Sequence, residues 1–166
     1  MRRAEYGTAG VPDYMGQGQL AERYTQFIIQ ELLPYLQQRY PTFPLTRRAF
    51  AGWSLGGLSA LDIVWRYPSF FQLAGIFSGS LWWRSKPLGA DYRDDRDRIM
   101  HQLIRVGNFH PGQQFFFECG TADETADRNM TLLPGKRPWL NFYNFSSSFR
   151  NQVVGHRCAD VKTMLG

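Results

Sequence analysis

The residues best suited to chemistry form the stretch Gly52-Trp53-Ser54-Leu55-Gly56, a Gly-x-Ser-x-Gly pattern. It follows a short apolar run and precedes a run with helical spacing, which is the context of a nucleophile elbow. At such an elbow, a sharp strand-to-helix turn holds the serine in a strained backbone conformation. We therefore expect Ser54 to be a nucleophile and the Leu55 N–H to face a developing oxyanion. Gly52 and Gly56 are expected to prevent collisions between the strand and the helix.

A serine nucleophile requires a general base, and the base requires an acid that orients it. In hydrolases with this elbow, the chain order is serine, then acid, then histidine. The best-placed acid is Asp123, in the turn directly after an apolar strand, because catalytic residues gather at strand carboxyl ends. The competing acids are Glu118, Glu124 and Asp127.

Only one of the three histidines, His156, follows Asp123, so we expect it to be the base. It comes after Val153-Val154-Gly155, where a loop at the end of a final strand could bring it towards Ser54. The alternative is an ordinary surface histidine. His101, within a helical run, and His110, before a proline, are expected to be structural.

Composition argues against several other classes of protein. Cys119 and Cys158 form no CxxC or Cys/His cluster, so we expect no metal site, and the proposed chemistry needs no cofactor. The net charge is +5, and the positively charged residues are dispersed along the chain. Residues 91–98 mix both signs, so no nucleic-acid partner is expected. No apolar run is long enough to span a membrane, and the first residues lack the apolar core of a signal peptide. A cytoplasmic location is the default expectation, although any export signal would lie upstream.

Periodicity predicts helices alternating with short apolar strands. Helices are expected at 19–39, from Ser54 to just before Pro68, and at 91–106, with a kink or break near Leu33 because Pro34 follows it. Strands are expected at 48–53, 73–78, 114–120 and 151–155. This alternation indicates an α/β fold with a mostly parallel sheet and helices on both faces. We expect one domain over residues 1–166, with its core at 19–129 and an irregular tail at 130–166.

Several longer segments carry a family resemblance. They are Glu5-Tyr6-Gly7-Thr8, Asp13-Tyr14, Glu31-Leu32-Leu33-Pro34, Gly52 to Ala60, Phe77-Ser78-Gly79-Ser80-Leu81-Trp82-Trp83 and Glu118-Cys119-Gly120-Thr121-Ala122-Asp123-Glu124. On these segments the chain resembles the "Putative esterase" family of α/β-hydrolases, which includes enterochelin-esterase-like and esterase D-like enzymes.

The resemblance implies roles for individual residues. It makes Ser54 the nucleophile and Asp123, in Gly-Thr-x-Asp, the acid, and it likens Gly155-His156 to the family's Gly-His at the last strand. It places the loop carrying Trp82 and Trp83 beside the acyl or alcohol pocket, with surface packing of the loop as the alternative. Trp53, next to the nucleophile, is also expected to contact the substrate.

The resemblance also implies that family members begin with several strands upstream of Glu5, one of whose loops supplies a second oxyanion donor. We therefore expect an incomplete, C-terminal portion of an α/β-hydrolase domain, which an upstream polypeptide or an oligomer could complete. The expected reaction is hydrolysis of a small-molecule carboxylic ester, of the siderophore-ester type, through an acyl-enzyme. The alternatives are a non-catalytic remnant of the fold and an acyltransferase of the same fold.

Overall fold

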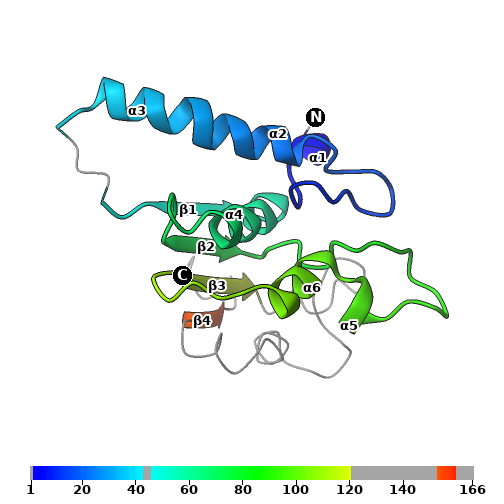
Figure 1. The fold of residues 1–166 in the computed structure, drawn as a ribbon. Helices are drawn as coiled ribbons and strands as arrows, with labels where there is room; N and C mark the ends of the chain where they lie inside the picture. The colour runs from blue at the N-terminus through cyan, green and yellow to red at the C-terminus, as the bar shows by residue number, and fades with distance from the viewer. Residues whose placement is uncertain (1, 43–45, 121–152, 160–166) are drawn as a thin grey trace, which may run out of the picture.

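A sheet of four parallel strands forms the centre of the molecule (Figure 1). The computed structural model describes residues 2–42, 46–120 and 153–159. The strands lie side by side in chain order: β1 (Ala49–Trp53), β2 (Leu73–Phe77), β3 (Gln114–Gly120) and β4 (Val153–Ala159). Each neighbouring pair is parallel, which confirms the predicted parallel α/β sheet.

The helices that accompany these strands fall mainly where periodicity predicted them. They are α1 (Arg2–Glu5), α2 (Ala21–Gln26), the π-helix η1 (Phe27–Leu32), α3 (Leu33–Arg39), α4 (Leu55–Arg66), α5 (Asp94–Asp97) and α6 (Ile99–Val106). The helix after Ser54 ends before Pro68, as predicted.

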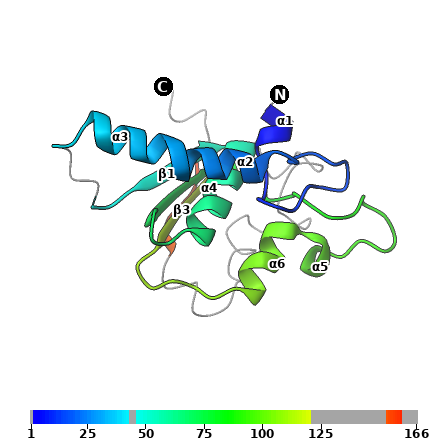
Figure 2. The ribbon, with the colours of Figure 1, turned by 45° about the horizontal axis from the view of Figure 1, so that its top comes forward.

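The helix does not break near Leu33, because α2, η1 and α3 form one continuous helix; the irregularity there is a π-helical middle (Figures 1 and 2). The Leu33 N–H donates to the carbonyl oxygen of Ile28, five residues back. Proline lacks an N–H, and its ring clashes with the carbonyl four residues earlier in a regular α-helix. Pro34 is the second residue of α3, just after the π segment, and the wider turn lets the helix continue.

The buried stripe of this long helix does not follow a regular α-helical spacing of its apolar residues. Phe27 and Tyr35 are 44% and 59% exposed. Residues in the π segment advance around the axis by a smaller angle than in an α-helix, so a stripe drawn at α-helical spacing drifts off the core. The residues that are buried are Ala21, Thr25, Ile28, Ile29 and Leu33.

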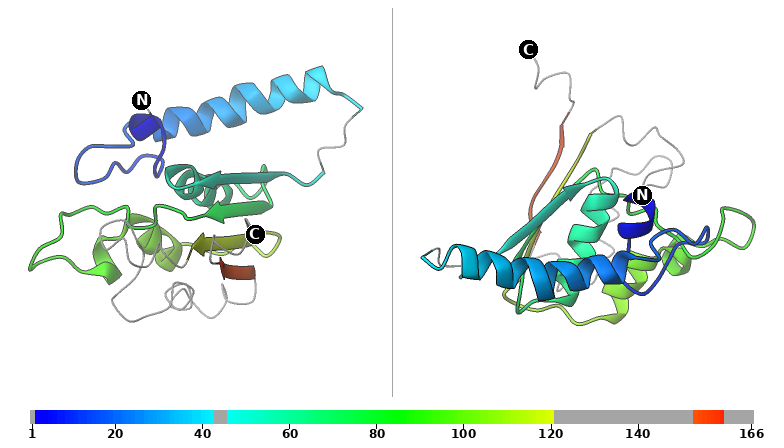
Figure 3. Two further views of the ribbon diagram at one scale, coloured as in Figure 1. Left: turned by 180° about the vertical axis from the view of Figure 1, so that it is seen from behind. Right: turned by 90° about the horizontal axis from the view of Figure 1, so that it is seen from above.

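The sheet has one well-covered face. Side chains that alternate along β2 and β3 are buried in a core shared with α4, α6 and the long helix; they are Ala74, Ile76, Phe115 and Phe117. The opposite face carries Phe77 and Phe116, which are half-buried. Seen from above in Figure 3, the described helices lie on one side of the strands. The predicted second helical layer is absent from the part of the chain that the structure describes, and burial alternates along residues 114–118 of β3, as expected of a strand covered on one face.

The single helix predicted at 91–106 is divided into α5 and α6. Arg98, between them, is extended (φ −80°, ψ 112°) and forms an isolated antiparallel bridge with Arg84. The Arg93 N–H donates to a carboxylate oxygen of Asp97 at 2.7 Å. Periodicity alone could not reveal this break, because periodicity does not report the pairing of Arg98 with Arg84.

Two buried polar side chains on α4 hold the N-terminal loop in place. Ser59 Oγ accepts the Gly7 N–H at 3.0 Å, and Asp62 Oδ2 accepts the Ala9 N–H at 2.8 Å. Asp62 also pairs with Arg66 at 2.8 Å. Burial raises the pKa of Asp62, and the Arg66 charge opposes that rise. The segment around Gly7 and Ala9 is therefore tied to α4, which begins at Leu55.

His101 lies on α6, and its burial makes the stability of the fold depend on pH. Both of its ring nitrogens are shielded from solvent. Burial, reinforced by the positive charges of Arg98 and Arg105, lowers the pKa of His101 from 6.5 to about 3. Because the unfolded chain takes up the proton first, stability is lost as the pH falls below 6.5 towards 3.

We expect the free energy of unfolding to fall by about 2 kcal/mol through His101 between pH 7.5 and pH 5. Urea unfolding at both pH values, for the wild type and for His101→Leu, measures this contribution. The variant should lose less stability on acidification by that amount. Asp62, whose raised pKa acts with the opposite sign, titrates in both proteins and cancels in the difference. Equal losses would show that His101 accepts a proton within the fold.

Candidate active site

Ser54 occupies a sharp turn between β1 and α4. Its backbone has φ 53° and ψ −121°, a positive φ that residues with a side chain rarely adopt. Such strain persists only where the surrounding structure enforces it. Here the Ser54 N–H donates to the Phe77 carbonyl at 3.0 Å, and the Ser54 carbonyl accepts the Leu58 N–H at 3.1 Å. The turn therefore has the backbone conformation predicted for a nucleophile elbow.

Glycines make this turn possible, although they differ in part from the predicted pair. A Cβ on Gly52 would lie 2.4 Å from both the carbonyl carbon and the oxygen of Gly56. A Cβ on Gly57 would lie 2.9 Å from the Gly52 oxygen and 3.1 Å from the Gly79 Cα. A Cβ on Gly56 would meet nothing within 4 Å, so the collision predicted there is wrong. Gly56 contributes its close-lying backbone, and Gly57 is the crowded position.

The hydroxyl of Ser54 is available for chemistry. Ser54 is exposed and makes no side-chain capping bond to α4. Its Oγ lies 3.1 Å from the Oγ of Ser80, a buried residue in the loop after β2. Sequence reasoning missed this neighbour, even though Ser80 lies within a segment that carries the family resemblance, because a serine in a loop has many ordinary roles.

The amino end of α4 lies at Ser54, where an oxyanion would form. The first N–H groups of a helix have no partner within the helix, and its dipole favours negative charge there. Leu55 is the first residue of α4, so its N–H belongs to this group. The placement agrees with the predicted position of Leu55, and its role in catalysis stays a prediction.

The three tryptophans predicted to bind substrate lie in different environments. Trp83 is fully buried, and a Cβ on either Gly7 or Gly18 would come within 2.8 Å of its ring, so its predicted substrate contact is wrong and its role is packing. Trp53 is 69% exposed, but its ring stacks on the ring of Phe77 with 4.7 Å between the ring centroids. The pair lies on the sheet face opposite α4. Trp82 is half-buried and remains the candidate for a substrate contact.

The described part of the structure does not place the predicted acid, Asp123, or the predicted base, His156, at Ser54. Asp123 lies outside the described residues. His156 was predicted to follow its strand, but it lies inside β4, where it pairs with Phe117. The register continues through Ile76 to Gly52 on β1. Three strand spacings separate β4 from β1, which amounts to ~14 Å. The strand itself therefore does not carry His156 to Ser54.

The other two histidines are also away from the elbow. His101 lies on α6. His110 precedes β3, and its Nδ1 accepts the Gly112 N–H at 3.4 Å. It therefore lies near the amino end of the sheet, whereas Ser54 follows the carboxyl end of β1. The structural roles of both residues stay predictions.

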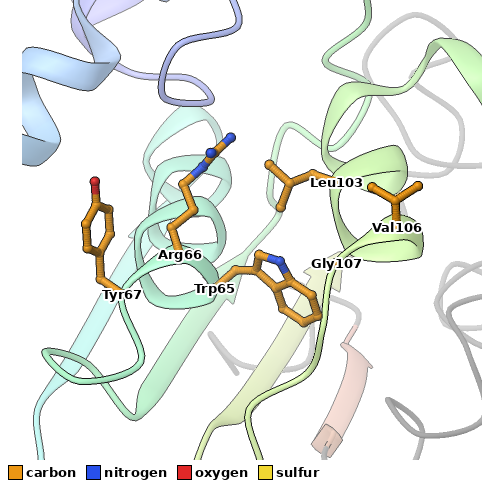
Figure 4. Close-up of a pocket in the computed structure, with 6 residues that line it drawn as sticks. All are labelled: Trp65, Arg66, Tyr67, Leu103, Val106 and Gly107. Carbon is orange, nitrogen blue, oxygen red and sulfur yellow. The ribbon is translucent and has the colours of Figure 1, made fainter.

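A pocket of about 490 Å³ lies at the other end of α4 (Figure 4). The helix has 12 residues, so its ends are ~18 Å apart, and the pocket is separate from the elbow. The residues that line it are Trp65, Arg66, Tyr67, Leu103, Val106 and Gly107. Within the described residues, no group of three or more His, Cys, Asp or Glu side chains is arranged to hold a metal ion. No helix in the same ranges is long and apolar enough to cross a membrane.

Comparison with known proteins identifies the family. A family model described as "Putative esterase" matches residues 2–137. The chain belongs to this esterase family. The resemblance inferred from the sequence is thereby confirmed. Among curated relatives, the siderophore triacetylfusarinine C esterase of Aspergillus fumigatus is 37% identical over 65 residues, which are 39% of this chain and 22% of that protein.

Solved structures support the α/β-hydrolase fold of this esterase family member. The enterobactin esterase FES from Shigella flexneri is 23% identical, with a TM-score of 0.59, over 82% of this chain and 32% of its own. The siderophore hydrolase EstA from Aspergillus nidulans is 17% identical, with a TM-score of 0.62, over 96% of this chain and 58% of its own. The chain thus spans less than two thirds of each protein's length.

Proposed function

We propose that this member of the esterase family hydrolyses carboxylic esters through an acyl-enzyme, with Ser54 as the nucleophile. The observation that carries the proposal is the backbone of Ser54, a non-glycine residue with φ 53° at a strand-to-helix turn. Strained residues of this kind cluster at functional sites. The exposed hydroxyl and the adjoining amino end of α4 supply a nucleophile and a positive dipole in one place.

The proposed reaction proceeds in two steps. Ser54 Oγ attacks the ester carbonyl carbon while the base takes its proton, and the Leu55 N–H stabilises the oxyanion. The base then gives the proton to the leaving alcohol, and water releases the acyl group in a second addition. His156 is the proposed base and Asp123 the proposed orienting acid. These two assignments rest on chain order and family resemblance, since the described residues do not bring either one to Ser54.

The proposed substrate is a small ester-bearing siderophore. Two relatives are named for such substrates, triacetylfusarinine C and enterobactin, and both share the fold or the sequence of this chain. We extend that substrate class to this chain as a proposal. Acyl transfer to an alcohol uses the same acyl-enzyme and differs only in the acceptor, so product analysis decides between them.

Hydrolysis of p-nitrophenyl acetate and butyrate by the purified chain, beside Ser54→Ala and His156→Ala, tests the nucleophile and the base. We expect Ser54→Ala to lower turnover at least ~10³-fold. Its circular-dichroism spectrum should not change. Loss in both variants would support the Ser54–His156 pair, and loss in Ser54→Ala alone would require another base. Full activity in Ser54→Ala, or a folded wild type without activity, would contradict the proposal and favour a non-catalytic member of the fold.

Enterobactin and triacetylfusarinine C then test the substrate class. Mass spectrometry of the products separates hydrolysis, which yields a free acid, from transfer, which yields a new ester with an added alcohol. Turnover of p-nitrophenyl esters without cleavage of either siderophore would retain the esterase and exclude the proposed substrates.

A further inference from the structure

Ser80 contacts the candidate nucleophile through both its backbone and its side chain. Its Oγ lies 3.1 Å from Ser54 Oγ, and its N–H donates to the Ser54 carbonyl at 2.9 Å. Ser80 is only 3% exposed, whereas Ser54 is exposed. A buried hydroxyl is costly unless it is hydrogen-bonded. The described hydrogen-bond partner of the Ser80 hydroxyl is Ser54 Oγ, the atom that would attack the ester.

The close approach of Ser80 to Ser54 results from the packing of the loop after β2 against the start of α4. Ser80 lies 26 residues beyond Ser54, in the loop after β2. Gly57 and Gly79 bring that loop against the start of α4, because a Cβ on Gly57 would lie only 3.1 Å from the Gly79 Cα. Ser78, in the same loop, also has a positive φ of 44°. The loop is therefore held tightly against the elbow.

The proposed reaction decides which hydroxyl donates. Ser54 must give its proton to the base, so during attack its Oγ can only accept a hydrogen bond from Ser80. As negative charge builds on Ser54 Oγ, this bond becomes charge-assisted and stronger. In the second step, Ser54 Oγ is the leaving group, and the same bond stabilises the charge that returns to it.

We propose that Ser80 is a positioning residue that orients Ser54 Oγ and stabilises the negative charge developing on it, in both formation and breakdown of the acyl-enzyme. This inference rests on the proposed function. Ser80 keeps its own proton throughout. In the first step, the Ser54 proton passes to the base and then to the leaving alcohol, while Ser54 Oγ bonds to the acyl carbon. In the second step, water adds to that carbon and gives a proton to the base, which returns it to Ser54 Oγ as the bond to the acyl carbon breaks.

The test is the rate of covalent labelling by a p-nitrophenyl alkylphosphonate, in which Ser54 Oγ attacks phosphorus and p-nitrophenolate leaves. Ser80→Ala removes the hydroxyl and retains the backbone bond to Ser54. We expect it to slow labelling at saturating probe about 10- to 100-fold, with an unchanged half-saturating concentration. Ser80→Thr, which keeps a hydroxyl, should recover most of the rate. Ser85→Ala is the matched control, since that hydroxyl bonds the Asp97 carbonyl at 3.3 Å, away from the elbow.

The outcomes distinguish this inference from the proposed function. A labelled wild type, an unlabelled Ser54→Ala and a slowed Ser80→Ala with wild-type melting temperature support both. If Ser80→Ala is labelled at least as fast as the wild type, the role of Ser80 alone is overturned. The same holds if only the half-saturating probe concentration changes. A lowered melting temperature in Ser80→Ala with no recovery in Ser80→Thr has the same consequence. A wild type that is not labelled at all overturns the proposed function and this inference together.

Discussion

Gly52→Ala is expected to destroy both the elbow and the reactivity of Ser54. The new Cβ would lie 2.4 Å from the carbonyl carbon and oxygen of Gly56, and neither backbone atom can move aside by a side-chain rotation. The strand and the helix must therefore separate. Overpacking of this kind costs 1–3 kcal/mol in ordinary cores, and we expect about 3 kcal/mol or more because backbone is displaced. A misplaced nucleophile should also react at least ~10²-fold more slowly.

Gly56→Ala provides a matched control four residues away. A Cβ on Gly56 meets nothing within 4 Å, and the position lies in the first turn of α4. Because alanine is favoured over glycine in helices by up to ~1 kcal/mol, the free energy of unfolding should stay the same or rise slightly. Chemical denaturation and phosphonate labelling of both variants measure the difference. Equal destabilisation of the two variants would show that the strand-to-helix turn is not packed as described.

Trp83→Ala is expected to have the largest effect on stability outside the elbow. The Trp83 side chain is fully buried, and its ring fills the space beside Gly7 and Gly18. Removing a buried tryptophan typically costs 3–5 kcal/mol, through lost burial and the cavity that remains. The change should also release the N-terminal loop, since that loop packs on the ring. Urea unfolding measures the first effect, and limited proteolysis within residues 6–18 measures the second.

Trp53→Ala is the corresponding control, because that side chain is 69% exposed and stacked on Phe77. We expect it to change the free energy of unfolding by about 1 kcal/mol or less. Together the pair tests the corrected view of the tryptophans. If Trp83→Ala left stability intact and changed only substrate affinity, the original prediction of a substrate contact would be restored.

The sequence by itself determined the elements whose signals are local. A glycine-flanked serine between an apolar run and a helical run was enough to place the turn between β1 and α4, and the structure reproduces it at Ser54. The strands and their parallel arrangement followed from alternating helical and apolar segments. Such features depend on residues within a few positions of one another, where periodicity and turn chemistry act directly.

The tertiary structure decided what depends on partners distant in the chain. The break at Arg98 and the extension of β4 across His156 accompany pairing with residues that lie beyond a short local window. The burial of Trp83 depends on a loop more than sixty residues earlier. The contact between Ser54 and Ser80 has the same origin. Residue types and spacing picked out Ser54 as the candidate nucleophile, whereas the neighbours of its hydroxyl became known only once β2 was placed beside β1.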